Sequence, residues 1–206
     1  MLQSAAAIGF YAIQMAFEVV YWRRRSSFES GQQVLKRSAG LDLYALPLPY
    51  LGRLALTIVF IAVAGWDWRS WFGLTATSAG VTVVIAVAMT FAWLATGRAR
   101  RAQTKTPARL LLRYLGFCVL WVGGVEELMF RGVLLLGVGG GVPAWLLSSA
   151  AHSAWHFQWY RTRPISYVLA FGISLVFGAT TLLTGSLWPA IAMHGLGDFI
   201  GNADRA

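Results

Sequence analysis

Apolar residues fill this chain in long runs, and polar residues gather mainly between the runs. An α-helix needs about 20 apolar residues to cross a bilayer. By this measure the pattern predicts seven transmembrane helices, at Ala5–Trp22, Leu46–Gly65, Ser78–Gly97, Leu110–Val138, Pro143–Tyr160, Ile165–Gly185 and Leu187–Asn202. The fifth and seventh are short and partly polar, which suits helices that their neighbours shield from lipid. The predicted fold class is all-α, a polytopic transmembrane helical bundle.

Composition supports a membrane protein. Of the 206 residues, 57% are hydrophobic and 12% are charged, about half of the 25% charged residues that are usual in soluble domains. We therefore interpret residues 1–206 as a single transmembrane domain, in which the polar stretch 26–45 forms a connection. The formal charge of +9 is not accompanied by any RNA- or DNA-reading motif, so nucleic acid is not an expected partner.

The basic residues predict the orientation of the bundle. They follow the first, third and fifth predicted helices, as Arg23, Arg24, Arg25, Lys36, Arg37, Arg98, Arg100, Arg101, Lys105, Arg161 and Arg163. The alternate connections carry only Arg69. Cytoplasmic loops of membrane proteins are enriched in lysine and arginine. We expect a multi-pass protein of the cell (inner) membrane, with its N-terminus outside and its C-terminus cytoplasmic.

Three polar groups interrupt the predicted helices of the C-terminal half: Glu126-Glu127 with Arg131, His152 with His156, and His194 with Asp198. An ionisable group at membrane depth costs about 2.5–3.5 kcal/mol on insertion scales. Stability therefore does not explain so many ionisable groups, and their types suit a hydrolytic site built around an activated water.

The first polar group contains two carboxylates with different expected roles. On a helix Glu127 and Arg131 are four residues apart and share a face, so they can form an ion pair. This pairing lowers the cost of burying Glu127 and leaves Glu126 to act as a general base for water. The alternative, a purely structural buried pair, does not explain the second glutamate.

The histidines leave a metal site open as one of two interpretations. His152 and His156 have an i, i+4 spacing, which can bind one metal ion on a helix face. Alternatively, one is a ligand or base and the other supports it. Asp198 can accept a hydrogen bond from His194 and fix its tautomer, or can itself bind a metal. Gly195, between them, would let another helix approach closely.

Together the motifs resemble the CPBP family of intramembrane proteases, which includes the CAAX prenyl endopeptidases and bacteriocin-processing proteins. The resemblance covers the expected catalytic core, residues 110–202, whereas residues 1–109 carry no recognised family motif. The register makes His156 the family histidine, with His152 in place of a phenylalanine. Asp198 stands where many members have asparagine. The resemblance implies that Glu126 and His156 activate water, while His194 and Asp198 help to hold the scissile carbonyl.

The expected function is that of an intramembrane endopeptidase that cuts near a membrane-embedded or C-terminal segment of a membrane-anchored protein or peptide. Glu127, Arg131 and His152 would support the catalytic residues. Two metal alternatives stay open, a zinc ion held by Glu126, His156 and His194, or a glutamate–histidine base without metal. Two other functions are a non-catalytic scaffold or immunity protein of the same fold, and an ion-coupled transporter, against which the absence of a repeated half argues.

Overall fold

The computed structural model describes residues 2–24, 47–97, 99, 107–157 and 164–202. Within these ranges the regular elements are all helical, and they form the short 3-10 helix η1 (Ser70–Phe72) and seven longer helices. The longer helices are α1 (Leu2–Arg24), α3 (Pro47–Ala64), α4 (Ala76–Ala95), a composite helix from Ala108 to Leu136, α8 (Gly141–Trp155), α10 (Pro164–Thr184) and α11 (Trp188–Asn202). The all-α prediction is confirmed for this part of the chain, and each predicted helix has a counterpart.

Two of the described helices, α4 and α10, are long and apolar enough to cross a membrane by themselves. The number of spans therefore stays a prediction. So does the orientation, because most of the basic residues behind it lie outside the described ranges, as do the predicted connection 26–45 and the end of the fifth predicted helix.

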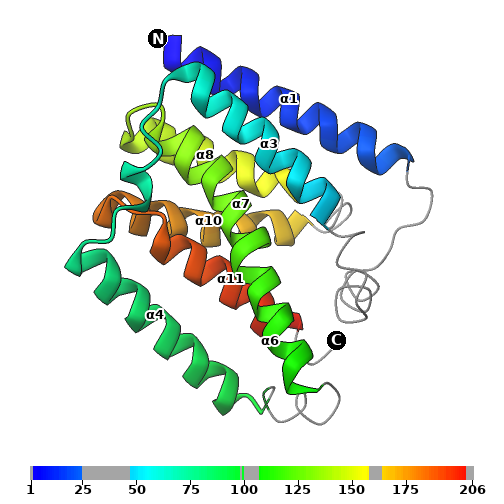
Figure 1. Ribbon diagram of the computed structural model, residues 1–206, viewed down its shortest axis with the longest axis vertical. Helices are drawn as coiled ribbons and strands as arrows, with labels where there is room; N and C mark the ends of the chain where they lie inside the picture. The colour runs from blue at the N-terminus through cyan, green and yellow to red at the C-terminus, as the bar shows by residue number, and fades with distance from the viewer. Residues whose placement is uncertain (1, 25–46, 98, 100–106, 158–163, 203–206) are drawn as a thin grey trace.

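The composite helix carries both glutamates at its centre. It consists of α6 (Ala108–Phe117), η2 (Cys118–Gly123), α7 (Gly124–Glu127) and η3 (Leu128–Leu136), where η2 and η3 are wound as π-helix. The wider π turn is rare and occurs often at functional sites. Here one turn of α-helix with Glu126 and Glu127 lies between two π segments. The composite helix as a whole runs through the middle of the molecule (Figure 1).

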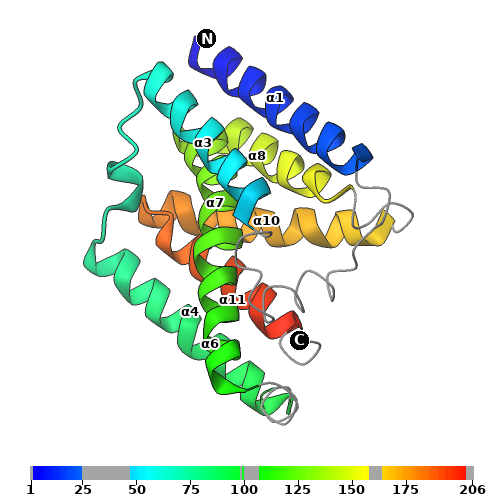
Figure 2. The ribbon, with the colours of Figure 1, turned by 45° about the vertical axis from the view of Figure 1, so that its right-hand side comes forward.

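The other helices surround the composite helix. Helices α1 and α3 lie side by side, and both contact η3, as do α8 and α10 (Figures 1 and 2). Helix α11 packs on η2 and against α4. The main core lies around η3, where Met129, Phe130, Val133 and Leu134 are almost completely buried. Helices α3 and α11 also contact α7, whose residues Val125, Glu126 and Glu127 are buried.

Helix α11 crosses η2 with its backbone in close contact. A Cβ atom on Gly195 would lie 2.5 Å from Val119 Cα and 2.9 Å from the Cys118 carbonyl oxygen. A Cβ atom on Gly123, which faces it, would lie 2.9 Å from the Ile191 carbonyl oxygen. Only glycine fits at this crossing, as expected for Gly195. The crossing brings His194, the neighbour of Gly195, against α7.

Candidate active site

Glu127 and Arg131 form a fully buried ion pair. Arg131 Nε lies 3.1 Å from Glu127 Oε2, and Arg131 Nη1 donates a hydrogen bond of 3.2 Å to Glu127 Oε1. The second terminal nitrogen, Nη2, donates to both the carbonyl oxygen and the hydroxyl of Ser174 on α10. A buried ion pair is tolerated only where additional hydrogen bonds replace those of water. Ser174, which the sequence did not point to, provides them here.

The same carboxylate holds His194. His194 Nδ1 lies 2.6 Å from Glu127 Oε1. An ionised carboxylate can only accept, so Nδ1 carries the proton and donates it. The ring then turns Nε2 toward Glu126 Oε2, at 3.7 Å, and toward Asp198 Oδ2, at 3.8 Å. Glu127 thus links Arg131 to His194 and fixes the direction of the imidazole.

Glu126, His152 and His194 form a buried cluster from three helices. Each contributes one potential ligand atom, and these atoms lie within 4.8 Å of one another. Glu126 Oε2 is 4.0 Å from His152 Nε2. It is buried without a hydrogen-bond partner, and so are both ring nitrogens of His152. Buried polar atoms are normally paired, so the gap between these three side chains suits a small polar species.

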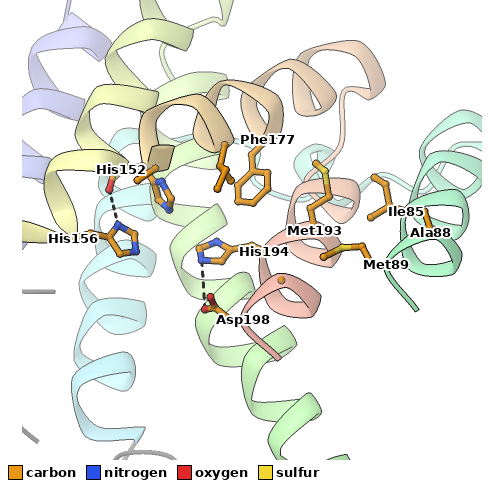
Figure 3. Close-up of a pocket in the computed structure, with 12 residues that line it drawn as sticks. Ile85, Ala88, Met89, His152, His156, Phe177, Met193, His194 and Asp198 are labelled. Carbon is orange, nitrogen blue, oxygen red and sulfur yellow. Dashed lines mark hydrogen bonds and ion pairs between the residues drawn. The ribbon is translucent and has the colours of Figure 1, made fainter. Parts of the chain in front are cut away.

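The structure places His152, rather than His156, in the group with Glu126 and His194, and the catalytic role of His156 stays a prediction. Helix α8 ends at Trp155, and His156 follows as its cap with φ −81° and ψ 14°. His156 Nδ1 lies 2.9 Å from the His152 carbonyl oxygen, to which it donates (Figure 3). Nδ1 of His156 therefore faces its own helix, while its ring lies against that of His152, with the two centroids 4.8 Å apart.

A fourth helix supplies a cation that the sequence did not assign. Arg53 on α3 is 4% exposed, and its Nη1 lies 3.5 Å from Glu126 Oε1. A single arginine in an apolar run of the sequence was consistent with a contact to a carboxylate, but the sequence did not identify Glu126 as its partner. Glu126 therefore has one oxygen beside a guanidinium and the other facing two imidazoles.

A pocket of about 510 Å³ leads to the histidines. Its walls are mostly apolar and come from α4, α10 and α11, including Met89, Phe177 and Met193 (Figure 3). His152, His156, His194 and Asp198 supply its polar lining. Asp198 is the accessible member, with its side chain 43% exposed. An apolar substrate segment could thus lie beside the polar cluster.

The spacing of the cluster lies between the spacing of zinc ligands and that of the hydrogen-bond partners of one water. Ligand atoms around tetrahedral zinc, at about 2.0–2.1 Å from the ion, stand roughly 3.3–3.4 Å apart. Partners of one water at about 2.9 Å stand roughly 4.7 Å apart. The measured separations are 3.7 and 4.0 Å, with none above 4.8 Å. Zinc would require the three side chains to move closer together, whereas a water with tetrahedral geometry would require Glu126 to move away from both histidines.

The helical bundle thus holds a buried carboxylate and two imidazoles beside an apolar pocket. This arrangement is typical of a membrane protein with a hydrolytic site. Residues 108–200 match the family model described as Rce1-like, type II CAAX prenyl endopeptidase. This segment contains all three polar groups, and the match supports the resemblance to the CPBP family of intramembrane proteases. Neither the curated proteins nor the solved structures contain a match to the chain.

Proposed function

We propose that this protein is an endopeptidase of the cell membrane that hydrolyses a peptide bond near a membrane-embedded or C-terminal segment of its substrate. The observation that carries the proposal is Glu126 Oε2, buried without a hydrogen-bond partner and 3.7 and 4.0 Å from the Nε2 atoms of His194 and His152. A water between these atoms would lie beside the pocket and within reach of a base.

Glu126 is the proposed general base. Water held between Glu126 Oε2 and His152 Nε2 gives its proton to Glu126 as its oxygen forms a bond with the carbonyl carbon of the substrate. The tetrahedral intermediate then breaks its C–N bond, and the proton on Glu126 passes to the leaving nitrogen. The products are a carboxyl group and an amine, and Glu126 returns to its initial state.

His194 is the proposed stabiliser of the oxyanion. Because its Nδ1 donates to Glu127, Nε2 becomes a donor when the ring is an imidazolium. Three carboxylates, those of Glu126, Glu127 and Asp198, lie within 4 Å of this ring and favour that cation. Preorganised donors toward an oxyanion commonly contribute about 2.7–4 kcal/mol to catalysis. Asp198, proposed as a partner of His194, takes no oxyanion role itself because an ionised carboxylate has no proton to donate.

The pocket supports an apolar substrate segment. Side chains such as Ile85, Met89 and Phe177 line it, so apolar residues or a lipid-modified side chain next to the scissile bond would be desolvated there. The polar cluster lies at one end of this lining. The proposed substrate is therefore a membrane-anchored protein or peptide whose scissile bond adjoins an apolar or lipid-modified segment.

The test uses purified protein in lipid nanodiscs and membrane-anchored reporters with C-terminal tails of CAAX type, with and without a prenyl group. Glu126→Gln, His152→Ala and His194→Ala should each reduce cleavage by at least 10²-fold, in line with the usual contribution of a general base. Gly201→Ala, whose new Cβ atom meets nothing within 4 Å, is the control and should keep most activity. Undiminished cleavage by Glu126→Gln would exclude the proposed base, and a wild-type protein inactive on every reporter would favour the scaffold.

A further inference from the structure

We propose that Arg53 is a positioning residue for Glu126, so that the N-terminal helices form part of the catalytic machinery. This inference rests on the proposed function. Arg53 lies on α3, outside the segment 108–200 that matches the protease family. Its Nη1 is 3.5 Å from Glu126 Oε1, and both side chains are about 5% exposed.

The contact distinguishes the two oxygens of the Glu126 carboxylate. Oε1 faces the guanidinium of Arg53, whereas Oε2 faces His152 and His194. A carboxylate with one oxygen held by a cation cannot rotate freely about its terminal bond. Arg53 therefore keeps the second oxygen directed at the place where the water would react.

Arg53 is itself held by two aromatic rings. Its guanidinium carbon lies 4.5 Å from the centroid of the Tyr50 ring and 5.0 Å from that of Trp155. Cation–π contacts of this kind are stronger when they are desolvated. Trp155 comes from α8, one turn from His152 along the sequence. The rings thus fix Arg53 relative to the helix that carries a histidine of the cluster.

A buried polar network also fixes the backbone at Arg53. Gln14 Nε2 on α1 donates to the Arg53 carbonyl oxygen at 3.2 Å and to Thr57 Oγ1 at 3.3 Å, and Thr57 Oγ1 donates to the same carbonyl at 2.7 Å. Gln14 and Thr57 are completely buried. Polar groups inside apolar helices are costly unless they are paired. Their position at Arg53 joins α1 to α3 at the turn that faces Glu126.

The charges agree with this role. Arg131 pairs with Glu127, and Arg53 lies against Glu126, so each adjacent carboxylate has its own guanidinium. Removal of one member of a buried pair leaves an uncompensated charge. Without Arg53, Glu126 would lose the cation that balances it and orients it, while Glu127, Arg131 and His194 would keep their contacts.

The experiment compares Arg53→Met and Arg53→Lys with wild type in nanodiscs, by steady-state kinetics on a cleaved reporter. We expect Arg53→Met to lower kcat at least tenfold and to leave KM within about twofold, because the pocket is lined by other residues. Arg53→Lys, which keeps the charge but not the planar fork, should recover part of the lost kcat.

The matched control is Ile61→Ala, two turns along the same helix and also buried. It should destabilise the protein without changing kcat per folded molecule. Cleavage by wild type and its loss in Glu126→Gln establish the function first, and their failure would overturn the proposed function. If they hold, an undiminished kcat in Arg53→Met overturns only this inference. Equal kcat losses in Ile61→Ala and Arg53→Met, or no recovery in Arg53→Lys, also overturn it.

Discussion

Replacement of Gly195 by alanine should show that the close crossing of α11 and η2 is needed for activity. The new Cβ atom would lie 2.5 Å from Val119 Cα and 2.9 Å from the Cys118 carbonyl oxygen, both of which belong to backbone. Neither atom can turn aside as a flexible side chain would. Since ordinary contacts begin near 3.4 Å, α11 must withdraw from η2 by about 1 Å.

Two opposing effects set the magnitude. Replacement of glycine by alanine favours a helix by about 1 kcal/mol, whereas overpacking of a tight contact costs about 1–3 kcal/mol. We therefore expect a net loss of stability of up to about 2 kcal/mol. The effect on activity should be larger, because His194 moves with α11, and a displacement of about 1 Å in a catalytic group can cost 10²-fold.

The measurement pairs cleavage kinetics with unfolding of the purified protein, and Gly201→Ala on the same helix is the control. A Cβ atom at position 201 meets nothing within 4 Å, so this variant should keep wild-type activity and equal or slightly higher stability. Wild-type activity in Gly195→Ala would refute the view that this crossing positions His194.

Three other outcomes follow from the structure. Glu127→Ala should destabilise the protein by about 3–5 kcal/mol, since it leaves Arg131 buried without its carboxylate. Ser174→Ala should cost about 1 kcal/mol, because the Ser174 carbonyl oxygen still accepts a hydrogen bond from Arg131. Unfolding measurements that rank the two variants in the reverse order would contradict this account. Treatment with a chelator should leave cleavage unchanged, and loss of activity that zinc restores would show that the cluster contracts around a metal. With Cys118 replaced by alanine, a cysteine at Ser70 should react with a membrane-impermeant maleimide from outside the cell, and labelling only after lysis would reverse the predicted orientation.

Hydrophobic patterning was sufficient to locate the helices, because each apolar run corresponds to a single helix. The i, i+4 pair of Glu127 and Arg131 was also predictable, since helical spacing alone places the two side chains on one face. Patterning could not detect that the central helix is partly π-wound. It also could not tell which polar groups of different helices would meet.

The choice between His152 and His156 shows this limit. Their i, i+4 spacing would place both on one face of a continuous helix, so spacing treats them as equivalent, and the family register favoured His156. What separates them is the end of the helix, where the ring of His156 donates back to the His152 carbonyl. Arg53 was beyond reach for a similar reason, because its partner is 73 residues away in the sequence and the contact depends on how α3 packs.

The two neighbouring glutamates show how packing can give adjacent residues of one type separate tasks. Glu127 is completely buried, and its Oε1 accepts hydrogen bonds from Arg131 and His194. Its Oε2 has no hydrogen-bond partner but lies 3.1 Å from Arg131 Nε, so both oxygens face Arg131 and the carboxylate is placed to position other groups. Glu126 has one oxygen beside Arg53 and one buried without a hydrogen-bond partner. Since a base needs an unoccupied lone pair directed at its substrate, only Glu126 is suited to that role, and the difference arises from the helices that pack around α7.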